Sequence, residues 1–374
     1  MPCNTPPPPT LDIPQEMDVV NDVIIYEEVD GEIIEILDND DSDLSFELHT
    51  DAVFCCNFNH TGELAVSGGQ DEKAHVWCTT TGDLKFSCDG HTDSVVNASF
   101  NHDSSYVATA GMDGLVQVWN VETGTKEWDF ETTEVTWMQW HPSSNLLFAG
   151  VNDGNCWKWS VPDGAICDVF PTHGVGTSCG HIFADGTKCA VGYADGTLKI
   201  WDINTSSVIG SVKDHTENVT CVISSHDGNL LATGSEDGSA KLVNPRNWRV
   251  LCTWGFPSNE EKETVESIGF FKSHPFIAVG TSGGVLSIFD ATTHQQRVTV
   301  NVELPVVKLI CSETSPTVYV ASGYEIQSYD ARSGQIEKKW IGHHLSILDI
   351  TLSPNGEQLM SASDDFTCKI FTTT

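Results

Sequence analysis

The sequence predicts an all-β fold, an eight-bladed β-propeller in which a strand near the N-terminus closes the last blade. Two observations support this prediction: a strand-like segment ending in an apolar, mostly aromatic residue recurs along the chain, and polar residues recur at fixed distances before it. The end residues are 40 to 46 positions apart, which fits the length of a four-stranded blade. They are Trp77, Trp119, Trp159, Trp201, Val243, Phe289, Tyr329 and Phe371.

Histidine, serine or threonine, and aspartate recur at fixed offsets from these end residues. A histidine stands 28 residues before five of them, and an aspartate stands six residues before six of them. In four copies a hydroxyl residue precedes the aspartate by four positions. The histidine would precede the innermost strand, the hydroxyl would lie on the second strand, the aspartate in the turn after it and the aromatic residue on the third. The histidines are His49, His91, His173, His215 and His343; the hydroxyl residues are Ser67, Thr109, Thr233 and Ser361; the aspartates are Asp71, Asp113, Asp153, Asp195, Asp237 and Asp365.

This set resembles a hydrolase triad in composition, but its repetition favours a structural role. We expect the aspartate to orient the histidine, and the histidine to bond the hydroxyl and, through it, the indole N–H, so that buried polar groups are satisfied. Copies 1 and 2 are complete with Trp77 and Trp119, whereas copies 5 and 8 lack the tryptophan. Copy 3 has Glu131 and Ala149 instead of histidine and hydroxyl, and copies 6 and 7 are degenerate, so we expect these blades to depend more on apolar packing.

The end of the chain predicts how the ring closes. Phe371 is three residues from the last residue, so the eighth copy has no room for an outermost strand. Residues 44–48 form a spare strand-like alternation before His49. We expect this strand to pair onto the last blade, because closure removes an open sheet edge.

These features resemble the WD-repeat pattern over residues 43–374. Gly90-His91, Gly342-His343 and Trp201-Asp202 are the signature dipeptides of that family. The resemblance implies a propeller that serves as a docking platform and carries no chemistry of its own. The prediction is therefore two regions, an acidic tail over 1–43 and an eight-bladed propeller over 44–374.

The tail differs from the propeller in composition. Residues 1–43 contain thirteen acids and no Lys, Arg or His. Such a self-repelling segment does not bury enough surface to offset chain entropy, so we expect disorder. Within it, Glu32–Leu37 alternates acidic and aliphatic residues, and a short docking strand is the alternative to a solvated segment.

The composition excludes several classes of function. The net charge is −35, which disfavours direct binding of nucleic acid or anionic lipid. There is no run of 18 apolar residues and no basic, apolar leader, so we expect neither a membrane span nor a secretory signal. The odd number of cysteines, 13, favours reduced thiols and the cytoplasm, with the nucleus and the periphery of the cell membrane as alternatives.

No sequence pattern indicates catalysis. The chain contains no phosphate-binding glycine loop, no HExxH and no Cys/His zinc spacing. Asp364-Asp365 forms a carboxylate pair, but Asp365 is the turn residue of copy eight. We expect a non-enzymatic monomer without cofactor or metal.

Acidic residues recur where the repeat places one mouth of the propeller. These positions lie in loops that lead into the innermost strands and in turns between the second and third strands. A ring of carboxylates focuses negative potential and attracts a basic segment, although a protein this acidic has acids in most of its loops. The predicted mouth residues are Asp51, Asp93, Glu134, Glu217, Glu236, Glu263, Glu303 and Asp364, with Tyr193 as an aromatic contact.

Several stretches further resemble the angio-associated migratory cell protein family. Examples are Lys73-Ala74-His75-Val76-Trp77, Trp137-Met138-Gln139-Trp140-His141-Pro142 and Val265-Glu266-Ser267-Ile268-Gly269-Phe270, although the tail is short and Pro-rich for that family. The resemblance implies two roles: Rho-linked signalling in cell migration and angiogenesis with heparin association, or, from a related fungal propeller, chaperoning the basic N-terminal segment of a large-subunit ribosomal protein. The acidity favours the ribosomal protein as partner and disfavours heparin, a polyanion. An adaptor of a ligase complex is a third alternative.

Overall fold

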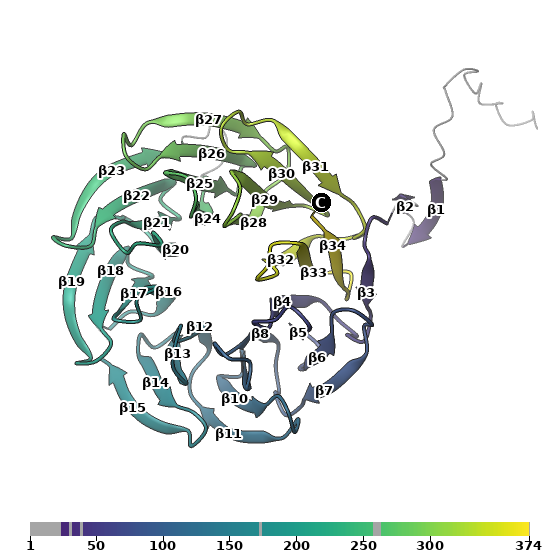
Figure 1. Cartoon of the computed structure of the whole chain (residues 1–374), viewed down its shortest axis with the longest axis horizontal. Coiled ribbons are helices and arrows are strands. Elements are labelled where there is room, and N and C mark those ends of the chain that lie inside the picture. The colour runs from purple at the N-terminus through teal and green to yellow at the C-terminus, as the bar shows by residue number, and fades with distance from the viewer. Residues whose placement is uncertain (1–23, 30–31, 38–39, 172–173, 257–262, 374) are drawn as a thin grey trace, which may run out of the picture. The chain divides into compact units, whose positions relative to one another are not determined.

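The structure is a computed structural model that describes residues 24–29, 32–37, 40–171, 174–256 and 263–373. The chain divides into two compact units, residues 1–40 and 41–374. The second unit is a closed ring of eight four-stranded antiparallel sheets (Figure 1). The predicted all-β, eight-bladed propeller is therefore confirmed.

The blades follow one another along the chain, each running from the innermost to the outermost strand. Blade 1 contains β4 (Val53–Phe58), β5 (Leu64–Gly69), β6 (Ala74–Cys78) and β7 (Leu84–Cys88), and blade 2 contains β8 (Val95–Phe100), β9 (Tyr106–Gly111), β10 (Leu115–Asn120) and β11 (Lys126–Glu131). Blade 3 contains β12 (Val135–Trp140), β13 (Leu146–Val151), β14 (Cys156–Ser160) and β15 (Ala165–Phe170), and blade 4 contains β16 (Thr177–Ile182), β17 (Lys188–Tyr193), β18 (Thr197–Asp202) and β19 (Ser207–Lys213). Blade 5 contains β20 (Val219–Ser224), β21 (Leu231–Ser235), β22 (Ser239–Asn244) and β23 (Arg249–Gly255), and blade 6 contains β24 (Val265–Phe270), β25 (Phe276–Thr281), β26 (Val285–Asp290) and β27 (Gln296–Asn301). Blade 7 contains β28 (Val306–Cys311), β29 (Thr317–Ser322), β30 (Glu325–Asp330) and β31 (Ile336–Trp340), and blade 8 contains β32 (Ile347–Leu352), β33 (Gln358–Ser363), β34 (Cys368–Thr372) and β3 (Leu44–Phe46).

The ring closes where the sequence predicts. Strand β3 supplies the outermost strand of blade 8 and pairs antiparallel with β34, Phe46 opposite Cys368. Phe46 is buried and stacks on Trp77 of blade 1 with ring centroids 4.6 Å apart. The strand ends at Phe46, earlier than the predicted residue 48, and Leu48 is exposed.

Apolar clusters hold neighbouring blades together. The described propeller contains eight of them, one at each blade junction, including the junction of blades 8 and 1. Inner strands add polar links, because side chains of one blade accept backbone N–H groups of the next. Asp349 accepts the N–H of Cys56 at 3.0 Å and also forms an ion pair with Lys308, so one carboxylate joins blades 7, 8 and 1.

The N-terminal unit contains a hairpin where the sequence led us to expect disorder. Strands β1 (Ile24–Val29) and β2 (Glu32–Leu37) pair antiparallel, with Ile24 opposite Leu37. Both strands contain runs of β-branched residues, which favour extended backbone. Most of the predicted disordered segment, residues 1–23, 30–31 and 38–39, lies outside the described residues.

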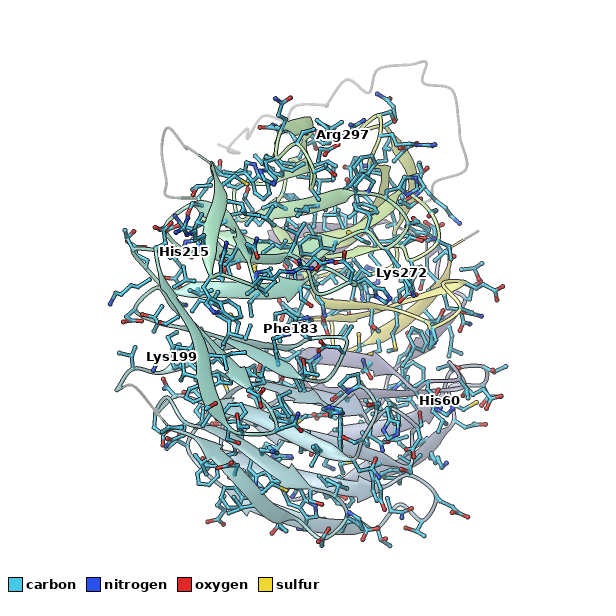
Figure 2. The ribbon with its side chains drawn as sticks, turned by 60° about the vertical axis from the view of Figure 1, so that its left-hand side comes forward. His60, Phe183, Lys199, His215, Lys272 and Arg297 are labelled. Carbon is cyan, nitrogen blue, oxygen red and sulfur yellow. The ribbon has the colours of Figure 1, made fainter. Side chains whose placement is uncertain are left out.

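Blades 1, 2, 5 and 8 contain the predicted His–Asp–hydroxyl contacts. The histidine Nδ1 lies 3.0, 3.3, 2.9 and 2.8 Å from the turn aspartate, and Nε2 lies 2.8, 2.9, 2.9 and 2.6 Å from the hydroxyl, in that blade order. Because a carboxylate only accepts, Nδ1–H donates to it, and Nε2 accepts from the hydroxyl. The residues are His49, Asp71 and Ser67; His91, Asp113 and Thr109; His215 (labelled in Figure 2), Asp237 and Thr233; and His343, Asp365 and Ser361.

The tryptophan completes this network in blade 1 but not in blade 2. Trp77 donates its indole N–H to Ser67 at 3.3 Å. The indole N–H of Trp119 has no partner, so the expectation of a complete copy 2 is wrong at this residue. Apolar packing holds Trp119 instead: its ring lies 6.5 Å from that of Phe86, within the cluster between blades 1 and 2. His173 lies outside the described residues.

We predict that the spare strand is essential for stability and the N-terminal unit is not. Deleting residues 44–48 removes Phe46 from the core and opens a sheet edge, so the free energy of unfolding should fall by more than about 3 kcal/mol. Deleting residues 1–40 should change the melting temperature by less than about 4 °C. Thermal and urea unfolding of both variants measures this, and equal effects of the two deletions would refute the closure argument.

We predict that Asp113→Ala destabilises the fold. The carboxylate accepts the backbone N–H groups of Thr92 at 2.8 Å and Leu115 at 2.9 Å in addition to contacting His91. Removing it leaves partly buried donors unpaired, so the loss should be about 1–3 kcal/mol by urea denaturation. Asp163→Ala, at an exposed turn, is the control and should have little effect. An Asp113→Ala variant of unchanged stability would exclude the proposed role of the turn aspartate.

We predict that acid weakens the fold partly through these aspartates. Burial alone would raise the pKa of Asp365, but hydrogen bonds from His343, Thr367 and a backbone N–H outweigh it and lower that pKa. A carboxyl with a lower pKa in the folded state stabilises the fold above its unfolded pKa of about 3.9 and loses this contribution as pH falls below that value. Denaturation between about pH 5 and pH 3 should show a shallower fall of stability for Asp365→Asn than for wild type. Parallel curves would contradict this assignment.

Candidate functional site

The loops leading into the inner strands and the turns after the second strands lie at the same end of each blade. Backbone hydrogen bonds join the two kinds of segment within a blade: the N–H of Asn152 donates to Glu134 at 3.0 Å, and that of Glu236 to Asn218 at 3.0 Å. We call this end the mouth face. It carries the predicted acids in every blade except blade 4, whose leading loop includes residues outside the described set.

Four of the predicted acids are well exposed on the mouth face. Asp93, Glu134, Glu217 and Glu303 are exposed. Within the described chain, Asp93, Glu134 and Glu303 form no ion pair, so no basic side chain there neutralises these three carboxylates. Asp93 Oδ1 accepts the N–H of Ser94 at 2.7 Å, which fixes the direction of that carboxylate.

Three further acids are half-buried at the same end. Asp51 accepts the N–H of Ala52 at 2.9 Å, and Glu236 accepts from the side-chain amide of Asn218 at 2.8 Å. Asp364 lies beside Asp365, and burial together with this neighbouring charge raises the pKa of Asp364. A nearby cation stabilises the charged form of such a carboxyl, because it offsets the repulsion from the neighbouring negative charge.

The structure removes Tyr193 from the predicted site. Tyr193 is the last residue of β17 and is fully buried, so it offers no aromatic contact to a partner. Its ring packs in the cluster between blades 3 and 4, and Lys199 (labelled in Figure 2) lies 5.6 Å from the ring centroid. Burial raises the pKa of the Tyr193 hydroxyl. From the sequence we expected Tyr193 in the turn, because the residue types there do not mark where strand β17 ends and the turn begins.

Glu263 has a structural role that the sequence did not reveal. Blade 6 has Gly283 where blades 1 to 5 and 8 have the turn aspartate, and a Cβ at Gly283 would lie 2.8 Å from the Glu263 carboxylate. The Glu263 side chain therefore fills the space that the missing aspartate would occupy, and its Oε2 is buried without a partner. In blade 7 the side chain of Leu304 similarly lies against Gly323.

One group of residues on blade 1 has the composition of a metal site. His49, Asp71 and His75 place ligand atoms within 4.8 Å of one another. Both ring nitrogens of His49 already contact Asp71 and Ser67. Burial lowers the pKa of His75 to about 4. These contacts assign His49 and Asp71 to the blade network.

The twelve described cysteines are free thiols, and seven of them are buried. Burial raises the pKa of Cys221 to about 12, which keeps that thiol protonated and unreactive. The described residues also contain no helix that is long and apolar enough to cross a membrane.

Comparisons with known proteins agree with the repeated blades of the structure. The family "WD domain, G-beta repeat" matches residues 42–78, 82–120, 125–160, 164–202, 206–244 and 334–372. Blade 6 and the first three strands of blade 7 fall in the gap between the last two matches.

Relatives and solved structures extend this likeness over most of the chain. The human and dog proteins named angio-associated migratory cell protein are each 36% identical to this chain, over 98% of it and 90% of their own length. Among solved structures, Saccharomyces cerevisiae Sqt1 has a TM-score of 0.82 at 21% identity, covering 90% of this chain and all of Sqt1. Chaetomium thermophilum Sqt1 bound to the N-terminus of the ribosomal protein L10 has a TM-score of 0.82 at 22% identity and the same coverage, a likeness that shows the fold.

The repeats, the closed eight-bladed ring and the identity along nearly the whole chain lead to one conclusion: this chain belongs to the WD-repeat family and, within it, to the angio-associated migratory cell protein family.

Proposed function

We propose that this protein is a non-enzymatic binding propeller that captures a basic segment of a large-subunit ribosomal protein on its mouth face. The observation that carries the proposal is the set of exposed carboxylates, Asp93, Glu134 and Glu303, that no basic side chain of the described chain pairs. The Sqt1 structure supports it, because a propeller of the same fold is bound there to the N-terminus of ribosomal protein L10.

The physical argument is electrostatic. Carboxylates from successive blades face the same solvent region, so their potentials add and raise the local concentration of a cationic segment. Each exposed charge pair contributes only about 0.2–1 kcal/mol, and several pairs together are needed for useful affinity. A segment rich in Lys and Arg meets this requirement, whereas heparin and nucleic acid carry the same sign of charge as the face.

A second candidate function comes from the name of the relatives. Angio-associated migratory cell protein points to a role in cell migration, in which the same face would hold a basic segment of a signalling protein. The two candidates share the surface and differ in the partner, so affinity purification with mass spectrometry separates them. Recovery of ribosomal protein favours the chaperone, and recovery of Rho-pathway or ligase components favours the adaptor.

We predict that neutralising the mouth face weakens capture of the basic N-terminal peptide of ribosomal protein L10. The variant replaces Asp51, Asp93, Glu217 and Glu303 by their amides, which retain the acceptor oxygens of the loop hydrogen bonds. Four pairs at the magnitude above predict a loss of affinity of about tenfold or more in a calorimetric titration. Wild-type affinity should also fall steeply with salt, since the Debye length shrinks from about 10 Å at 0.1 M to about 3 Å at 1 M.

A matched control separates local from global charge. Replacing Glu63, Glu122, Asp163 and Glu357 by amides removes the same charge from exposed turns at the opposite end of the blades. This control should bind like wild type. Equal loss in both variants would mean that net charge alone drives binding, and a wild-type protein that does not bind the peptide would refute the ribosomal partner.

A further inference from the structure

The mouth face also carries an apolar patch at blades 7 and 8. It consists of four large side chains that are 38–51% exposed, each in a loop or turn at the mouth end. The polar sequence pattern of these loops gave no sign of it. The apolar patch comprises Leu304, Tyr324, Leu345 and Phe366.

Hydrogen bonds place these four residues on adjoining segments. Ser322 donates its hydroxyl to the carbonyl of Leu304 at 2.9 Å, and Ser363 donates to that of Leu345 at 3.3 Å. The N–H of Ile347 donates to Gly323 at 2.7 Å, which ties the mouth segments of blades 7 and 8 together. The segments that carry the apolar patch therefore adjoin one another across one blade junction.

The backbone conformation of Phe366 is unfavourable for a residue other than glycine. Its φ is 70°, in the left-handed region that favours glycine. The matching turn position is Glu72, with φ 64°, in blade 1, and it is a glycine with positive φ in blades 2 to 6, namely Gly114, Gly154, Gly196, Gly238 and Gly284. In blade 8 the chain instead holds a large aromatic ring there and leaves it exposed. A strained and exposed aromatic side chain contributes little to the core, so an external contact is the simplest account of it.

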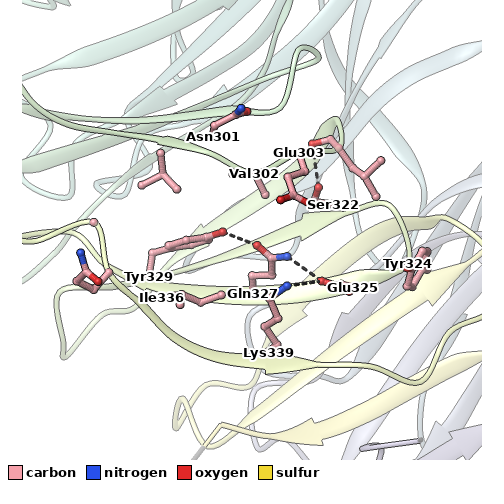
Figure 3. Close-up of a pocket in the computed structure, with 14 residues that line it drawn as sticks. Asn301, Val302, Glu303, Ser322, Tyr324, Glu325, Gln327, Tyr329, Ile336 and Lys339 are labelled. Atoms are coloured by element: carbon pink, nitrogen blue, oxygen red, sulfur yellow. Dashed lines mark hydrogen bonds and ion pairs between the residues drawn. The ribbon is translucent and has the colours of Figure 1, made fainter. Parts of the chain in front are cut away.

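The patch adjoins a cleft and acidic residues. A cleft of about 360 Å³ between blades 6 and 7 is lined by Leu304, Tyr324, Glu303 and Glu325 (Figure 3). Among the other lining residues, Gln327 donates to Glu325 at 2.8 Å and Lys339 lies 3.1 Å from the same carboxylate. Glu303 is exposed beside Leu304, and Asp364 lies two residues from Phe366. Apolar and anionic groups thus share one area.

We propose that the apolar patch binds aliphatic or aromatic side chains of the same basic segment that the mouth carboxylates attract, so that the partner is an amphipathic basic segment and not a purely cationic one. This inference rests on the proposed function and specifies the chemistry of its ligand. Charge complementarity selects this occupant. The chain's own first 43 residues carry thirteen acids and no base, and a second copy carries a net charge of −35, so the mouth face repels both.

The test combines Phe366→Gly with Leu345→Ser and measures binding of the L10 N-terminal peptide by calorimetry. Loss of two apolar contacts should weaken binding about tenfold or more. Phe366→Gly alone should keep or raise the melting temperature, since glycine relieves the left-handed backbone. Ile166→Ser, which removes an equally exposed aliphatic residue from β15, is the control and should bind like wild type.

A pair of synthetic peptides separates the inference from the proposed function. Both carry the same Lys and Arg residues, and one has interspersed Leu where the other has Ser. Wild type should bind the Leu peptide more tightly, and the double variant should bind both alike. If the L10 peptide fails to bind but this preference holds, the ribosomal partner is wrong and the patch stands. Equal affinity of wild type for the two peptides, or unchanged L10 binding by the double variant, overturns the patch.

Discussion

The pairing of β3 with β34 is the contact on which the rest of the structure depends. The last blade is complete only with a strand from another part of the chain, because the C-terminal copy supplies three strands. Strand β3 adds the fourth and places Phe46 against Trp77 at the junction of blades 8 and 1. Once the ring is closed, the described leading loops and the turns after the second strands lie at one end, so acids that are scattered in the sequence form a common surface.

The blades differ in how their mouth segments are held. Blades 1, 2, 5 and 8 keep the His–Asp–hydroxyl contacts that hold their mouth segments in place. Blades 6 and 7 have lost them, and glycine at the turn position there makes room for the side chains of Glu263 and Leu304. Leu304 is also part of the apolar patch. Two of the departures from the repeat, those of blades 6 and 7, therefore lie beside the proposed contact for a partner.

The sequence was sufficient for the fold because a propeller is encoded in a period and a few offsets. The spacing of end residues gave the number of blades, and the room left after Phe371 gave the mode of closure. Contacts that depend on side-chain direction were not accessible. Tyr193 was placed in a loop although it ends a strand, and Trp119 was given a hydrogen bond that its surroundings do not provide. The apolar patch was missed because its four members come from only two repeats, and among them only Tyr324 and Phe366 share an offset.

The central claim is that a basic segment lies across the mouth face. Hydrogen–deuterium exchange of the free protein and of its complex with the L10 N-terminal peptide tests it most directly. The account predicts slower exchange on binding in residues 90–94, 302–305 and 342–346, with no change in turns at the opposite end such as 121–125. Protection confined to the opposite turns or to the outer strands would contradict it.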